Sequence, residues 1–191
     1  MKNLAIFASG SGSNTEVIVR HFAESELARI VLVITDRKDA GVIERMKKFD
    51  IRIRIIDKEA LMGEELLSVL QTARVDLIVL AGFLRKIPGL IIDAYPNRII
   101  NIHPSLLPDY GGKGMYGMNV HKAIIENEEE ESGITVHYVN EEFDEGEIIF
   151  QETVEIDPDD TAEDLAYKIQ QLEHKHYPEV IEWVLNREFI D

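Results

Sequence analysis

An asparagine and a histidine lie two residues apart in the segment Asn101-Ile-His103-Pro-Ser-Leu-Leu-Pro108. In an extended strand, residues two apart point to the same side, so we expect the side chains of Asn101 and His103 to converge. An Asn amide and a protonated imidazole are donors of the kind that stabilise the oxyanion of an acyl-transfer intermediate. For His103 taken alone, a polar turn residue before a proline is about as good an interpretation.

Two more polar segments follow along the chain. Thr135 and His137 are again two residues apart, and Asp144 lies in a polar loop. An Asn, two His and an Asp that come from strand ends and a loop are sufficient for acid–base chemistry on a tetrahedral intermediate. Without the 101–108 segment, Asp144 would be interpreted as a turn residue in Asp-Glu-Gly. Together, these residues predict a catalytic site.

A glycine-rich turn, Ala8-Ser-Gly-Ser-Gly-Ser-Asn14, joins an apolar run to a helical pattern. Glycine lets a backbone approach a ligand closely, and the free amides at a helix start favour an anion, so this turn is a candidate phosphate site. A simple reversal of direction after a strand is the alternative. Because Thr15 stands where a dinucleotide fingerprint has its third glycine, a monophosphate ester fits the turn better than a dinucleotide.

The elements that position these residues can be inferred from the apolar pattern. Five runs rich in Ile, Val and Leu alternate with helical spacing, which predicts an α/β fold with a mostly parallel sheet flanked by helices. These runs are 4–8, 30–35, 51–56, 76–81 and 98–102. The first helix is expected to begin with a capping box, Ser13 and Glu16.

The second half of the chain has a different pattern of predicted elements. It predicts two strands, at 133–139 and 147–156, joined by the polar loop 140–146, and so antiparallel strands in the C-terminal half. A long helix is expected from about Thr161, with a kink or break at Pro178.

The composition restricts the class of protein. The 191 residues are 45% hydrophobic and have no linker of Pro, Gly or Ser, which predicts one domain. A net charge of −16 argues against binding to nucleic acid or to an anionic membrane, and the acidic block 126–131 is interpreted as a solvated helix end and loop. With no cysteine, no signal peptide and no apolar run long enough to span a membrane, we expect a cytoplasmic protein.

With the segments 8–14, 81–88 (Ala-Gly-Phe-Leu-Arg-Lys-Ile-Pro), 101–108 and 133–146 in this order, the chain resembles the folate-dependent formyltransferase family over essentially its whole length. The resemblance implies a Rossmann-like formyltransferase fold in a single domain, 1–191, with a phosphate-binding half at about 1–100 and a catalytic and folate-binding half at about 101–191. It also implies transfer of a formyl group from 10-formyltetrahydrofolate to the amine of glycinamide ribonucleotide, in purine (IMP) biosynthesis.

The resemblance carries roles to matching positions. The catalytic residues would be Asn101, His103 and Asp144, with Thr135 and His137 orienting a water molecule and Asp144. The phosphate and ribose would be bound by Gly12, Ser13, Asn14 and Glu173, although a solvated helix face is the alternative for Glu173. The folate would be bound by Leu84, Arg85, Lys86, Ile87, Val139, Asn140 and Asp144.

No metal is expected, because His174 and His176 lie on different faces of a helix. The expected partners are the two small-molecule substrates; monomer and homodimer both stay open. One segment departs from the family pattern: residues 109–117, rich in glycine, are longer than expected and suit a mobile loop over the site.

Related families share the catalytic constellation. Methionyl-tRNA formyltransferase usually adds a basic C-terminal domain and formyltetrahydrofolate deformylase an N-terminal regulatory domain, and 191 residues leave room for neither. A non-catalytic nucleotide sensor that uses only the glycine-rich turn would leave Asn101, His103 and Asp144 unexplained.

Overall fold

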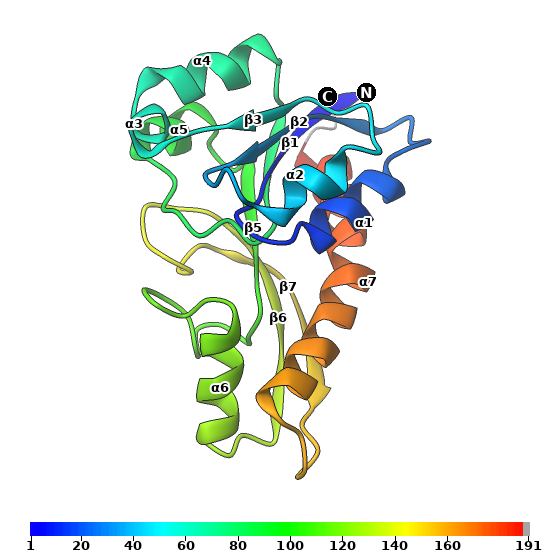
Figure 1. Cartoon of the computed structure of the whole chain (residues 1–191), viewed down its shortest axis with the longest axis vertical. Coiled ribbons are helices and arrows are strands. Elements are labelled where there is room, and N and C mark those ends of the chain that lie inside the picture. Colours follow the sequence, from blue (N-terminus) through cyan, green and yellow to red (C-terminus); the bar gives the residue numbers. More distant parts are fainter. Residues whose placement is uncertain (189–191) are drawn as a thin grey trace.

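A computed structural model describes residues 1–188 of the chain, and its centre is a seven-stranded sheet with the order β3-β2-β1-β4-β5-β6-β7 (Figure 1). The strands are β1 (Lys2–Phe7), β2 (Ala28–Thr35), β3 (Ile53–Ile55), β4 (Leu77–Leu80), β5 (Ile99–His103), β6 (Glu131–Tyr138) and β7 (Ile148–Glu155). The first five strands pair in parallel, whereas β6 pairs antiparallel with both β5 and β7. The mostly parallel sheet with antiparallel strands in the C-terminal half is confirmed.

Helices cover both faces of the sheet (Figure 1). They are α1 (Ser13–His21), α2 (Gly41–Met46), α3 (Lys58–Met62), α4 (Glu64–Thr72), α5 (Gly89–Ala94), α6 (Met118–Glu126) and α7 (Ala162–Glu188). None of the helices within residues 1–188 combines the length and the apolar character that crossing a membrane requires.

The alternation along β1 shows how the two cores arise. Leu4 and Ile6 belong to a buried cluster with residues of α1, α6 and α7, whereas Ala5 and Phe7 belong to a second cluster with residues of α3, α4 and α5. Because successive side chains of a strand point to opposite faces, a strand buried on both faces reads as one apolar run. This double burial explains why the apolar runs of the sequence predict the strands.

The capping box expected at the start of α1 is wrong. The N-cap is Gly12, whose φ of 75° lies in the left-handed region, and no side chain caps the helix. The Glu16 carboxylate instead accepts hydrogen bonds from Arg20, Arg45 and Lys48, and these three cations lower its pKa to about 2. Ion pairing thus replaces the local cap at Glu16.

Helix α7 continues through Pro178, so the expected break is wrong. Proline removes one backbone hydrogen bond from a helix, but Tyr177, Val180 and Ile181 around it are all buried against the sheet. The hydroxyl of Tyr177 also donates to the carbonyl of Leu80 at 2.8 Å. Tertiary packing of this kind stabilises a helix more than one lost bond destabilises it.

Candidate active site

The register of β5 against β6 brings the predicted catalytic residues together. Asn101 pairs with His137 and His103 with Thr135 across the two antiparallel strands. Paired residues, and residues two apart on one strand, share a face of the sheet, so all four side chains lie on one face. The structure thus brings together two segments that residues 104–134 separate in the sequence.

The hydrogen bonds of His137 fix the orientation of the Asn101 amide. His137 Nδ1 lies 2.8 Å from the carbonyl oxygen of Tyr138, which can only accept, so Nδ1 carries the hydrogen. In the neutral ring, Nε2 then accepts a hydrogen bond from Asn101 Nδ2 at 3.0 Å. The amide nitrogen has a second hydrogen, which it can donate to a substrate. His137 therefore positions Asn101 as a donor.

His103 lies between a backbone carbonyl and the carboxylate of Asp144. Its Nε2 donates to the carbonyl of Tyr110 at 2.8 Å, and its Nδ1 is 3.6 Å from Asp144 Oδ2. Burial lowers the pKa of His103 below its ordinary value, and the nearby charge of Asp144 and the Tyr110 carbonyl oppose this shift. A protonated His103 therefore depends on Asp144, whose negative charge favours the imidazolium.

Asp144 is the third member of the cluster. Its Oδ1 lies 3.7 Å from His137 Nε2, and its Oδ2 accepts a hydrogen bond from the N–H of Gly112 at 2.9 Å. Burial works against the charged form, but the contact with His137, the charge of His103 and the Gly112 N–H outweigh it and lower the pKa of Asp144. The carboxylate is thus ionised at neutral pH and able to accept a proton.

Thr135 has a different contact from the expected one. Its hydroxyl donates to the carbonyl of Ser105 at 2.7 Å and accepts from the N–H of Leu107 at 3.0 Å. Gln151 of β7 donates to the same hydroxyl at 2.9 Å. Thr135 therefore holds the backbone that follows His103, instead of touching Asp144.

A small cleft of about 60 Å³ that opens to solvent lies beside the catalytic cluster. Of the residues expected to bind folate, all but Leu84 line it. Its lining is Leu80, Phe83, Arg85, Lys86, Ile87, Asn101, His137, Val139, Asn140, Glu142, Phe143 and Asp144. Leu84 is 44% exposed and does not line the cleft, and its backbone N–H donates to the Ser9 hydroxyl.

Two aromatic residues of this cleft were missed by sequence reasoning, Phe83 and Phe143. Each adjoins a predicted site residue, and Phe143 directly precedes Asp144. The ammonium of Lys86 lies 5.7 Å from the centre of the Phe143 ring. This contact links the 81–88 segment to the loop that carries Asp144, and the loop then forms one wall of the cleft.

The glycine-rich turn lies at the start of α1, where Glu173 of α7 meets it. Asn14 Nδ2 donates to Glu173 Oε2 at 2.8 Å. Burial raises the pKa of Glu173 to about 7, and the hydrogen bond from Asn14 opposes the shift. Gln170, one helical turn before Glu173, donates to the Ser13 hydroxyl at 3.4 Å. The spacing of Gln170 and Glu173 on α7 is the signal that could have found this second contact.

A cationic group also adjoins this turn. Arg45 of α2 donates to the carbonyl of Ser11 at 2.9 Å while it contacts Glu16. The turn therefore offers an anion the amides of a helix start next to a fixed guanidinium.

Among residues 1–188 there is no group of three or more His, Cys, Asp or Glu side chains that could hold a metal ion.

Comparisons with known proteins agree with this geometry. Residues 2–181 match the formyl transferase family. The phosphoribosylglycinamide formyltransferase of Bacillus subtilis is 40% identical over 191 residues, which cover 97% of this chain and 95% of the relative. The chloroplastic enzymes of the same name from Arabidopsis thaliana and Vigna unguiculata are 42% and 38% identical, and the chain spans 64% and 60% of their lengths.

Solved structures give the same result. The phosphoribosylglycinamide formyltransferase of Bacillus halodurans superposes with a TM-score of 0.88 at 37% identity, covering 98% of this chain and 97% of that one. Glycinamide ribonucleotide transformylase 1 of Symbiobacterium toebii superposes with a TM-score of 0.89 at 36% identity, covering 97% of this chain and 88% of that one. The chain therefore belongs to the formyl transferase family, in its group of phosphoribosylglycinamide formyltransferases.

Proposed function

We propose that this chain transfers the formyl group of 10-formyltetrahydrofolate to the amine of glycinamide ribonucleotide, which gives formylglycinamide ribonucleotide and tetrahydrofolate. The observation that carries the proposal is the cluster of Asn101, His103 and Asp144 beside an open cleft. The names of its relatives support the same substrate, and the glycine-rich turn supports a phosphate ester.

The cluster has the parts for this reaction. The amine attacks the formyl carbon, a C–N bond forms, and negative charge develops on the formyl oxygen. Asn101 Nδ2 has a hydrogen to donate to this oxygen, and a protonated His103 adds positive charge beside it. When the C–N bond to the folate breaks, one proton has left the amine and one has reached the folate nitrogen.

Asp144 is the group we propose to relay that proton. Its lowered pKa keeps the carboxylate ionised, so it accepts the proton of the attacking amine and returns it to the leaving nitrogen through water. When His103 is protonated, its Nδ1–H, 3.6 Å from the carboxylate, stabilises the charge of Asp144. No other base is needed for the proton balance.

The folate would occupy the cleft. Phe83, Ile87 and Val139 supply apolar walls for a ring, and the backbone of the 140–144 loop supplies polar groups for its edge. The ribonucleotide phosphate would bind at Gly12, Ser13 and Asn14, with Glu173 near the ribose. We also propose that residues 1–191 act as one cytoplasmic domain, monomer or homodimer, without nucleic acid or metal.

A formyl-transfer assay tests the proposal. The chain should consume 10-formyltetrahydrofolate only when glycinamide ribonucleotide is present; consumption without the amine would identify a deformylase instead. Asn101→Ala should lower kcat roughly a hundredfold, the usual cost of losing an oxyanion donor. Near-normal turnover of this variant would show that the amide is structural.

A further inference from the structure

One residue next to the catalytic cluster has a costly backbone conformation. Tyr110, whose carbonyl accepts the hydrogen bond of His103, has a φ of 56°. The left-handed region is uncommon for residues other than glycine, because the side chain then crowds the backbone. A residue of this kind persists when its surroundings hold it in place.

The phenol of Tyr110 supplies that hold. Its hydroxyl donates to Glu129 Oε1 at 2.6 Å and accepts from Asn127 Nδ2 at 2.8 Å. Burial and the bond to Glu129 raise the pKa of Tyr110, so the hydroxyl stays a donor at neutral pH. Glu129 belongs to the acidic block 126–131, whose composition alone predicts only a solvated helix end and loop.

The residues around Tyr110 contact the acid–base pair through the backbone. The Tyr110 carbonyl binds His103, and the N–H of Gly112 binds Asp144. Between them, a side chain on Gly111 would have its Cβ 2.6 Å from Leu107 Cδ2 and 3.4 Å from Asp144 Cβ. The segment 109–112 is therefore packed closely against the catalytic residues, and a shift of Tyr110 would reach both of them.

We propose that Tyr110 is a positioning residue, whose phenol, anchored by Glu129, holds the backbone carbonyl that fixes the ring of His103. A carbonyl only accepts, so it places the hydrogen of neutral His103 on Nε2 and turns the lone pair of Nδ1 toward Asp144. Without the anchor, the ring can exchange its hydrogen between the two nitrogens. The kinetic consequence rests on the proposed formyl transfer, whereas the hydrogen position does not.

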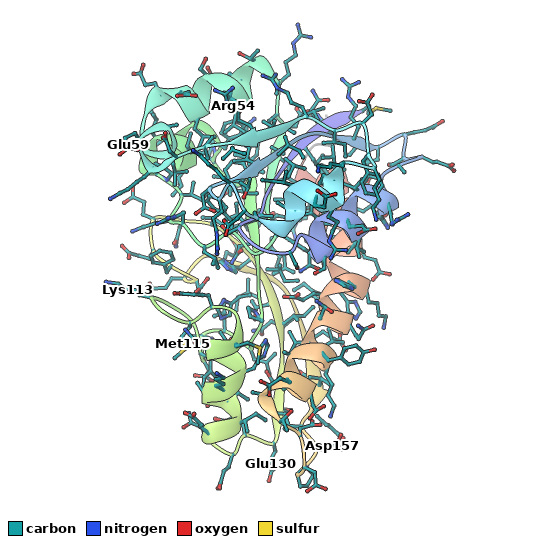
Figure 2. The ribbon with its side chains drawn as sticks, in the orientation of Figure 1. Arg54, Glu59, Lys113, Met115, Glu130 and Asp157 are labelled. Atoms are coloured by element: carbon teal, nitrogen blue, oxygen red, sulfur yellow. The ribbon has the colours of Figure 1, made fainter. Side chains whose placement is uncertain are left out.

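The alternative is that the hydrogen bond between Tyr110 and Glu129 affects only the stability of the fold. Two pairs of variants separate the alternatives. Tyr110→Phe and Glu129→Ala remove the anchor from either side, and Glu129→Gln keeps an acceptor oxygen. Tyr167→Phe and Glu130→Ala are matched controls. Tyr167 is an exposed tyrosine of α7, and Glu130 is the exposed neighbour of Glu129, at the lower end of the molecule in Figure 2.

The first readout is the ring of His103 in nitrogen NMR of the free protein. In the parent chain we expect one protonated nitrogen, Nε2. In Tyr110→Phe and Glu129→Ala we expect a mixture of the two tautomers, and in Glu129→Gln the parent pattern. An unchanged ring in both anchor variants would overturn the proposal, even if the parent chain had no formyl-transfer activity.

The second readout is turnover. Tyr110→Phe and Glu129→Ala should lower kcat about tenfold, the rate effect of about 1.4 kcal/mol, with each KM changed less than about twofold. The basic limb of the kcat profile should move to lower pH, because the Tyr110 carbonyl, together with Asp144, favours the imidazolium of His103 against burial and the facing rings of His137 and His121. Equal losses in Glu130→Ala, or a fall in stability with kcat unchanged, would contradict the positioning role.

Discussion

The two ligand-facing regions of this molecule are built in different ways. The glycine-rich turn is contiguous in the chain and offers mostly backbone groups at the start of one helix. The catalytic cluster takes Asn101 from β5, His137 from β6 and Asp144 from a loop, and it depends on side chains. A site of backbone amides follows from local conformation, whereas a site of side chains requires the correct strand register.

The two regions also differ in the pKa of their carboxyl groups, Asp144 and Glu173. Burial acts on both Asp144 and Glu173 in the direction of the neutral form. Asp144 lies beside His137 and His103 and accepts a hydrogen bond from the Gly112 N–H, and together these contacts lower its pKa. Glu173 has only the amide of Asn14, so its pKa rises to about 7. The groups around each carboxyl, together with the depth of its burial, decide which one is ionised.

The largest effect is expected in the side-chain site. Asp144→Asn keeps the shape of the residue but cannot accept a proton, so turnover should fall by about a thousandfold or more. Both ligands should still bind, because the proposed phosphate contacts lie elsewhere and the volume is kept. Calorimetry of each ligand beside a turnover assay measures the two properties. Loss of binding together with turnover would remove the proton-relay role.

A smaller effect is expected in the backbone site. Gly12→Ala places a Cβ 2.6 Å from Val42 Cβ at a φ of 75°, so it should raise the KM for the ribonucleotide about tenfold and leave the KM for the folate nearly unchanged. Gly10→Ala is the matched control, since its Cβ meets no heavy atom within 4 Å. Equal losses for both substrates would disprove the assignment of the turn to the phosphate.

The smallest effect concerns stability. Because the folded-state pKa of Glu173, about 7, lies above its ordinary value of 4.5, the native state loses stability as the pH rises from 4.5 through 7. Glu173→Gln should remove this loss, with a gain of about 1–2 kcal/mol at pH 8, less than the full shift because the side chain is only partly buried. Urea unfolding at pH 4 and pH 8 should show the gain at pH 8 alone.

Much of the fold followed from the sequence because burial on both faces leaves a simple pattern. The apolar runs at 30–35 and 98–102 became β2 and β5, whereas the run at 51–56 was predicted too long, because the edge strand β3 has only three residues. At Pro178 the helix is not broken, since packing against the sheet outweighs a missing hydrogen bond. Local rules predict the elements, and tertiary contacts correct their ends.

The site was predictable in part, for the same reason. The spacing of Asn101 and His103 predicts a shared face, but nothing in the sequence sets His137 opposite Asn101 or places the Tyr110 carbonyl on His103. Those contacts follow from register and from a left-handed residue, which a pattern of residue types does not encode. Leu84 shows the converse, because its neighbours Phe83 and Arg85 line the cleft while Leu84 itself does not.

The pairing of β5 with β6 limits where the chain can change in length. A slip of one residue would place Val136 or Tyr138 opposite Asn101 and turn His137 to the other face. Insertions and deletions within these two strands should therefore be selected against, while the connection between them, residues 104–130, is free of that constraint. Within that connection, residues 113–117 of the glycine-rich segment lie beyond the residues that contact His103 and Asp144, so new specificity can evolve there while the catalytic register is kept.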